Sequence, residues 1–201
     1  MQRKTIVVLV IVGIIIFVAL SIFGWATGVY NSLVKLDESV NQAWAQVQNQ
    51  YQRRADLIPN LVETVRGYAA HESQVFTDVA EARASVGKIQ LTPEMLNDPQ
   101  TFQKFEQAQA GLSSALSRLL AVAENYPQLK ANENFLQLQS QLEGTENRIA
   151  VERRRFNEFV QEFNVKIRTF PASFIAGMMG FHEKAYFQAE PGAEKAPKVK
   201  F

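Results

Sequence analysis

The sequence contains no cysteine among its 201 residues. This absence excludes disulfide bonds, thiol catalysis and zinc–thiolate sites. Histidine is also scarce, because only His71 and His182 are present. A carboxylate-bridged di-iron site in a helical bundle needs Glu-x-x-His pairs, and the residues three positions before these histidines are Tyr68 and Met179. The sequence therefore predicts no metal site and no cofactor.

The chain also lacks a large excess of positive or negative charge. The formal net charge is +1, and Arg3 and Lys4 alone exceed it, so the rest of the chain gives no electrostatic reason to expect nucleic-acid binding. No glycine-rich loop has the spacing that cradles phosphates, and no histidine or lysine stands in a spacing that would activate a hydroxyl nucleophile. We expect no catalytic residues and no enzymatic activity.

One long apolar run is present near the N-terminus, from Ile6 to Phe23, and no charge interrupts it. With the next few residues it reaches about 20 residues, which is enough to cross a hydrocarbon layer of about 30 Å. The alternative is a signal peptide, but the apolar core of a signal peptide is only about 7–15 residues long. The exit sequence Trp25-Ala26-Thr27-Gly28 also offers no clear cleavage site. We therefore predict a short basic N-terminus at 1–5 and an uncleaved transmembrane anchor at 6–28.

The distribution of basic residues indicates how the anchor is oriented. Arg3 and Lys4 precede it, whereas the first basic residue after it is Lys35, which acidic residues follow closely. By the positive-inside rule the N-terminus is cytoplasmic and the remainder lies outside. Gly24 and Gly28 form a GxxxG spacing that could bring two anchors into close packing.

After the anchor, apolar residues recur at three-to-four spacing, and strand-like alternation of useful length is missing. Pro59 predicts a kink or a restart of the first helix. The expected helices after it cover about 60–86, 99–125 and 131–169, followed by a short apolar piece at 172–181. The fold class is all-α: the transmembrane helix, then an elongated antiparallel bundle at 29–186 and an extended tail at 187–201.

The fourth helix has the clearest pattern, a phenylalanine-rich heptad repeat. Its members are Phe135, Leu142, Ile149, Phe156, Phe163 and Phe170. Such a repeat predicts packing along the whole helix with a left-handed crossing. The apolar piece at 172–181 that follows has two interpretations, a cap on the bundle or an element that dips into the membrane, and the cap is the one we favour.

Charged residues concentrate in two places that could face one another across the bundle. The expected members of this ion network are Arg53, Arg54, Asp56, Glu63, Glu143, Glu146 and Arg153. Buried ion networks fix register and partner choice better than they add stability, so a structural role is our first interpretation. A binding site for an anionic ligand is the second.

Two blocks of sequence carry a family resemblance. The first is YQRRADLIPNLV at 51–62, continued by Gly67-Tyr68-Ala69 and His71-Glu72. The second runs from Tyr126-Pro127 through LEGTENRI at 142–149 to Arg153, Asn157, Asn164 and Phe170-Pro171. These blocks resemble the LemA family. The resemblance implies a bacterial envelope protein with an N-terminal transmembrane helix and an antiparallel helical bundle, with no assigned catalytic residues and no cofactor.

Three functional hypotheses follow. The first is a non-enzymatic scaffold of the bacterial inner (cytoplasmic) membrane with a periplasmic bundle, which self-assembles through its long helices. Its expected partners are the lipid bilayer, further copies of itself as a homo-oligomer and other envelope proteins, and nucleic acid is excluded. The second is an envelope-stress sensor or partner- or ligand-binding module with a polar site near Arg53, Glu143 and Arg153. The third and weakest is metal-dependent catalysis.

Overall fold

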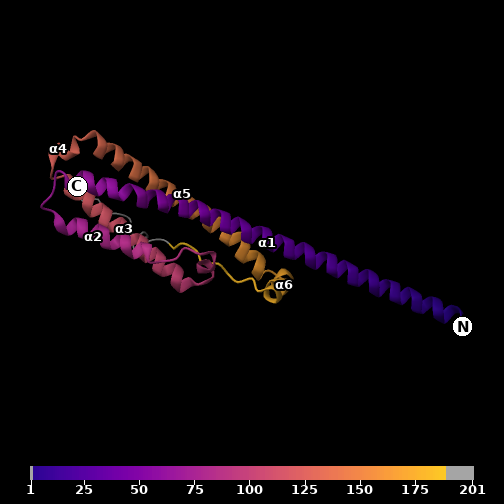
Figure 1. Ribbon diagram of the computed structural model, residues 1–201. Helices are drawn as coiled ribbons and strands as arrows, with labels where there is room; N and C mark the ends of the chain where they lie inside the picture. The colour runs from indigo at the N-terminus through magenta and orange to yellow at the C-terminus, as the bar shows by residue number, and fades with distance from the viewer. Residues whose placement is uncertain (1, 189–201) are drawn as a thin grey trace, which may run out of the picture.

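The longest element of the computed structural model, which describes residues 2–188, is the helix α1 (Gln2–Arg66) of 65 residues. At 1.5 Å per residue it is about 98 Å long. All its side chains from Ile6 to Phe23 are exposed, whereas from Leu33 onward one face is buried. Figure 1 shows the N-terminal part of α1 projecting alone from the bundle. One helix therefore serves both as the apolar N-terminal segment and as a bundle element.

The prediction of a kink or restart at Pro59 is wrong as far as a restart is concerned, because α1 continues through this residue to Arg66. Proline removes one amide donor from a helix, but Ile58, Leu61 and Val65 on the same face are fully buried. Their burial holds the helix on both sides of the proline. The chain turns instead at 67–72, where Gly67 follows the last turn of the helix.

The remaining elements come after this turn. They are α2 (Ser73–Gly87), the 3₁₀-helix η1 (Pro93–Asn97), α3 (Pro99–Ala123), α4 (Pro127–Lys130), α5 (Glu133–Arg168) and α6 (Ala172–Met179). No strand occurs in the described part of the chain, so the all-α prediction is confirmed. The helices expected at 99–125 and 131–169 are found within two residues of their predicted ends. The helix expected at 60–86 is the one that the turn at 67–72 divides.

Side-chain caps explain where two of these helices begin. The Asp98 carboxylate accepts a hydrogen bond of 3.0 Å from the Gln100 amide at the start of α3. The Asn132 side chain accepts one of 3.0 Å from the Phe135 amide at the start of α5. Each cap satisfies an amide that has no partner within its helix. The Thr92-Pro93 pair, in contrast, precedes a 3₁₀-helix and its hydroxyl makes no capping bond.

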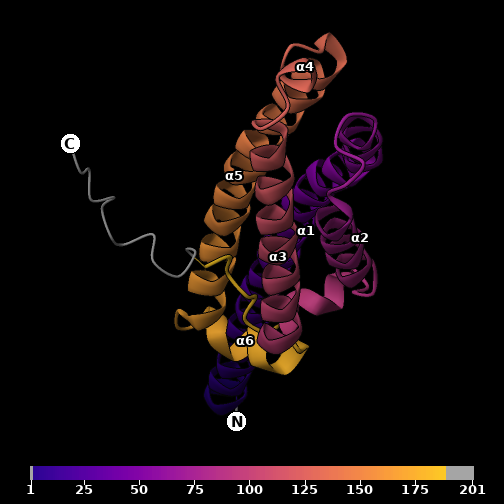
Figure 2. The same ribbon diagram turned by 90° about the vertical axis from the view of Figure 1, so that its left-hand side faces the viewer.

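The main contact of the bundle joins α1 to α5, and α2 packs against α3 (Figure 2). The heptad residues of α5 from Phe135 to Phe163 are buried, as the repeat predicts. The prediction is wrong for its last member, because Phe170 lies beyond the end of α5 and is 83% exposed. The repeat is therefore used inside the chain, against α1, over the four heptads from Phe135 to Phe163.

The buried side chains form two hydrophobic cores along the length of the bundle. We call the one nearer the apolar N-terminal segment the proximal core; it surrounds Trp44, Phe105 and Phe156. The other, the distal core, surrounds Leu61 and Leu116 near the turn after α1. The boundary between the two cores crosses α1, α3 and α5 at one level, and this level holds polar side chains.

After α6 the chain reverses and returns beside α5 in an extended conformation. Gly180 permits the reversal because its φ of 76° lies in the left-handed region that favours glycine. We call residues 181–188 the return segment. Its last residues approach the boundary between the two cores.

Candidate functional site

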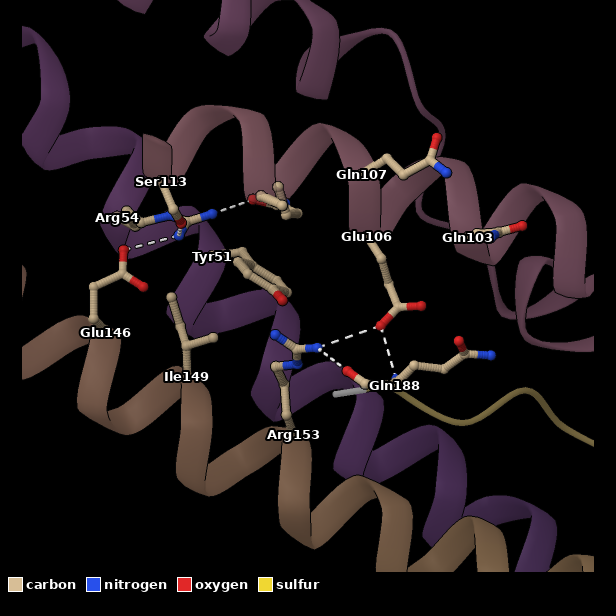
Figure 3. A pocket seen from close by; sticks show the side chains of 12 residues that line it. Tyr51, Arg54, Gln103, Glu106, Gln107, Ser113, Glu146, Ile149, Arg153 and Gln188 are labelled. Atoms are coloured by element: carbon tan, nitrogen blue, oxygen red, sulfur yellow. Dashed lines mark hydrogen bonds and ion pairs between the residues drawn. The ribbon is translucent and has the colours of Figure 1, made fainter. Parts of the chain in front are cut away.

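Arg54 of α1 occupies the centre of the polar level between the cores, with only 2% of its surface exposed. One guanidinium nitrogen donates hydrogen bonds to the Ser113 hydroxyl at 2.9 Å and to the Glu146 carboxylate at 2.8 Å. The other nitrogen donates to the side-chain oxygen of Gln109. The guanidinium also lies 5.2 Å from the centre of the Tyr51 ring. Figure 3 shows these groups converging from α1, α3 and α5.

The heptad spacing of three helices explains why polar groups meet here. On α1, Arg54 stands between Tyr51 of the proximal core and Ile58 of the distal core. Gln109 of α3 and Thr145 of α5 are buried at the matching positions between the cores. A buried guanidinium is tolerated only when it is paired and hydrogen-bonded. This level therefore fixes the register of all three helices.

A second polar cluster joins α3, α5 and the return segment. Arg153 donates hydrogen bonds to the Glu106 carboxylate at 3.3 Å and to the Gln188 carbonyl at 3.2 Å. The same Glu106 oxygen accepts the Gln188 amide at 3.0 Å. The Arg153 guanidinium also lies over the Phe187 ring, 4.5 Å from its centre. The ion pair thus holds both backbone polar atoms of Gln188, at the end of the return segment.

Two asparagines of α5 hold the return segment further along. The Asn157 side chain bonds both the amide and the carbonyl of Phe187, and Asn164 does the same for Lys184, each bond being 2.9 Å. The two asparagines are seven residues apart, about 10.5 Å along a helix. The two residues that they hold, Lys184 and Phe187, are three positions apart, about 10 Å in an extended chain. The match of these two lengths sets the register of the return segment.

A cavity of about 190 Å³ lies between the two polar clusters. Its wall includes Tyr51, Arg54, Glu106, Glu146 and Arg153, and Figure 3 shows their side chains around it. It is smaller than the roughly 300–1,000 Å³ of most small-molecule pockets. Its two guanidinium groups face two carboxylates, so it carries no formal excess of either charge.

Burial controls the protonation of two groups in the cavity wall. It raises the pKa of Tyr51 to about 12, against the lowering effect of Arg153 and Arg54, so the phenol stays protonated at neutral pH. Burial also raises the pKa of Glu106, and the hydrogen bond from Gln188 and the charge of Arg153 oppose this. The cavity therefore offers both hydrogen-bond donors and acceptors.

The structure brings only part of the expected ion network together. Arg54 and Glu146 pair, and Arg153 joins the neighbouring cluster with Glu106 instead. The other members lie exposed on the surface: Arg53, Asp56, Glu63 and Glu143. Three of these contact neighbours on their own helix, namely Gln52, Arg66 and Gln139. Successive helix residues point about 100° apart, so Arg53 and Arg54 cannot both face inward.

Sequence reasoning missed the partners that α3 contributes. Glu106, Gln109 and Ser113 recur at three-to-four spacing on the helix, and this spacing was the available signal. It also assigned no role to Asn157 and Asn164, although they are one heptad apart. The polar site expected near Arg53, Glu143 and Arg153 lies instead between Arg54, Glu146 and Arg153.

The N-terminal part of α1 is the one candidate membrane span in the described residues. Its most apolar window has a mean hydropathy of 3.4 and none of it is buried. Gly24 and Gly28 lie in the exposed region at the end of the apolar run, and a Cβ added at either would meet nothing within 4 Å. The face they form is therefore open to another helix.

Comparison with known proteins adds a family match. The model of the LemA family matches residues 43–201, which include most of the bundle but not the apolar N-terminal segment. The family match thus begins within α1, at the level of the proximal core.

Named relatives are similar at low identity. The magnetosome protein MamQ 2 of Paramagnetospirillum magneticum is 27% identical over 181 residues, which cover 82% of this chain and 66% of the relative. The magnetosome protein MamQ of Magnetospirillum gryphiswaldense is 28% identical with the same coverage. Protein LemA of Metamycoplasma hominis is 23% identical over 159 residues, covering 79% of this chain and 68% of the relative. The chain spans just under two thirds of the length of the MamQ relatives.

Proposed function

Because the chain belongs to the LemA family, we propose that it is a non-enzymatic, membrane-anchored helical scaffold of the bacterial envelope. The observation that carries the proposal is the continuity of α1, which runs from the exposed apolar segment into the bundle without a loop. A helix without a break transmits position and direction between its ends. The bundle is therefore a rigid extension of the anchor, which suits a part that holds other components at a defined distance from the membrane.

The non-enzymatic part of the proposal has support in the character of the polar groups. Arginine stays protonated in proteins, so Arg54 and Arg153 cannot act as proton carriers. His71 and His182 are exposed and follow α1 and α6, at opposite ends of the bundle (Figure 1). A general base and a nucleophile need hydrogen-bond reach of each other, which these positions do not give.

Self-assembly is also part of the proposal, but the structure points to a different contact between copies from the one that the sequence suggested. The heptad residues of α5 are buried against α1 inside one chain, so they are not available for contacts between copies. The open face at Gly24 and Gly28 is the better candidate, because small residues at GxxxG spacing let two membrane helices approach closely. We therefore propose that copies associate through their anchors.

The mass of the full-length protein in mild detergent, measured by light scattering after size exclusion, tests self-assembly. We expect a discrete particle of several copies, and the double variant Gly24→Leu/Gly28→Leu should shift it toward the monomer. Gly13→Leu in the same apolar run is the matched control, because its Cβ would also meet nothing within 4 Å. A monomeric parent protein would remove self-assembly from the proposal.

For the location, we propose the inner (cytoplasmic) membrane, with a cytoplasmic N-terminus and a periplasmic bundle. The basic residues Arg3 and Lys4 before the apolar run support this orientation. The lipid bilayer is then the first partner of the chain, and other envelope proteins are the proposed partners of the bundle.

A second candidate function, a sensor or ligand-binding module that responds to envelope stress, is favoured by the cavity beside Arg54 and Arg153. Its balanced charges suit a ligand that carries both donors and acceptors. Thermal unfolding of the full chain with inorganic phosphate or with glycylglycine tests it, since a ligand bound to the folded state raises the unfolding temperature. The shift should disappear in Arg153→Ala, whereas the assembled scaffold should persist in that variant. If neither probe raises the unfolding temperature, the sensor hypothesis loses its support and the scaffold remains the proposed function.

A further inference from the structure

The end of the bundle beside the apolar N-terminal segment presents unpaired apolar side chains to the outside. Phe170 is 83% exposed, Phe174 67%, Met178 65% and Met179 55%. Phe170, Phe174 and Met178 recur every four residues, and no charged residue stands between Arg168 and His182. We call these four side chains the α6 patch.

The opposite face of α6 is packed against the bundle. Ala172, Ile175 and Ala176 are buried, and Ala176 belongs to the proximal core. One apolar face of α6 is thus buried against the bundle, and the opposite face, which is exposed, is apolar as well. A surface helix of a soluble domain normally carries polar residues on that outer face. The interpretation of 172–181 as a cap on the bundle accounts for the buried face but leaves the α6 patch unexplained.

The position of α6 relative to α1 indicates what covers the patch. The rings of Phe181 and Tyr30 lie 6.1 Å apart, so the end of α6 contacts α1 near residue 30. The apolar run of α1 ends at Phe23, which is seven residues earlier, about 10.5 Å along the helix. Figures 1 and 2 both show α6 at the end of the bundle from which α1 projects. The patch therefore lies about one headgroup layer from the apolar run.

The residues around the patch fit the same environment. Trp25 and Tyr30 of α1 are exposed at 43% and 40%, and such aromatic residues favour the headgroup layer. Arg168 and Glu183 flank the patch, lie exposed and approach each other to 3.8 Å. Apolar side chains inside a polar border are typical of helices that lie in the membrane interface, where they reach about 5–10 Å deep.

We propose that the α6 patch is a second lipid contact, in which Phe170, Phe174, Met178 and Met179 enter the leaflet from which α1 emerges. The occupant is a lipid surface because the patch lies at the end of the bundle from which the exposed apolar run of α1 projects (Figure 1). Two contacts, one spanning and one interfacial, fix the tilt and the rotation of the bundle against the membrane. The polar cavity is then held at a constant height.

The test uses the full-length protein in nanodiscs of phosphatidylcholine and phosphatidylglycerol. Because the chain has no cysteine, Phe174→Cys, Met178→Cys and Ser85→Cys each accept a single nitroxide label. The accessibility of each label to oxygen and to a water-soluble nickel chelate is measured by electron paramagnetic resonance. Ser85 on α2 is exposed and is the control for water, and Ile14→Cys in the apolar run is the control for lipid.

We expect the ratio of oxygen to nickel accessibility at 174 and 178 to exceed that at 85 several-fold and to approach that at 14. A ratio at 174 and 178 equal to that at 85 would overturn the proposal. Shielding of these labels from both reagents would also overturn it, because it would mean that protein covers the patch. A water-like ratio at 14 would instead contradict the membrane anchor, so failure of the anchor and failure of the α6 contact are distinguishable.

Discussion

Arg54 of α1 and Glu146 of α5 form an ion pair of 2.8 Å although they are 92 residues apart in the sequence. The pair stands between two hydrophobic cores, so a shift of either helix by one turn would bury the guanidinium among apolar side chains. Such a pair adds little stability relative to an apolar replacement, but it makes alternative registers unfavourable. In a bundle of long helices many registers bury a similar apolar area, so a polar pair that selects one register makes the fold unique.

The first prediction concerns this pair. Arg54→Ala should lower the free energy of unfolding by about 2–3 kcal/mol, below the range for fully buried pairs because Glu146 is 40% exposed. Arg53→Ala is the matched control, since its exposed side chain should change stability by less than about 0.5 kcal/mol. Chemical denaturation of both variants in detergent, followed by circular dichroism, gives the comparison. Equal losses in the two variants would contradict the assignment of Arg54 to the interior.

The second prediction concerns the return segment. Asn157→Ala removes both hydrogen bonds to Phe187 and should loosen this segment at a cost of about 1–3 kcal/mol. Lys184 is only 8% exposed in the native chain, so trypsin should cleave after it faster in the variant. Asn147→Ala, an exposed asparagine on the same helix, is the control. An unchanged cleavage rate in Asn157→Ala would show that other contacts hold the segment.

The third prediction concerns pH. Burial raises the folded pKa of Glu106 above its ordinary value of 4.5. The folded state then keeps a proton that the unfolded state releases, so this contribution to stability is present below about pH 4.5 and is lost as the pH rises through the folded pKa. The unfolding temperature of the parent minus that of Glu106→Gln should therefore fall as the pH rises above about 4.5.

Glu143→Gln, which removes an exposed carboxylate from α5, is the control for this measurement. Thermal unfolding across the same pH interval gives both differences. A parent-minus-Glu106→Gln difference that rises with pH would mean that the ion pair with Arg153 outweighs burial.

The fourth prediction concerns topology, which the absence of cysteine makes simple to test. Ser85→Cys should react with a membrane-impermeant maleimide in intact cells whose outer membrane has been made permeable, because the proposed bundle is periplasmic. Gln2→Cys should react only after lysis. The reverse pattern would place the bundle in the cytoplasm, and it would leave the proposed contact of α6 with lipid on the cytoplasmic leaflet.

Sequence patterns predicted the parts of the fold that one helix face determines by itself. The heptad of α5 is such a local signal, and the helix that it predicts is found in the structure. The course of α1 through Pro59 was not predictable from local signals, because burial on both sides of the proline overrides its cost.

The candidate site was less predictable than the helices. The choice between Arg53 and Arg54 depends on which face of α1 meets α5, and no single helix contains that information. Glu106 could not be assigned because its partners, Arg153 and Gln188, come from a helix and an extended segment far along the chain. The return segment could not be predicted either, because its sequence has no helical or strand periodicity. Its conformation depends on hydrogen bonds to Asn157 and Asn164 of α5.

The pairing of α1 with α5 also has a consequence for biosynthesis. The ribosome makes α1 first, yet its packing partner begins only at Glu133 and the return segment is made later still. During this interval the inner face of α1, with Trp44 and Val47, lacks its main cover. A nascent chain is thus a helix with an uncovered apolar face, and it can complete its proximal core only when synthesis reaches Phe187. Truncation before that point would leave Trp44 without the Phe187 ring that packs against it in the complete chain.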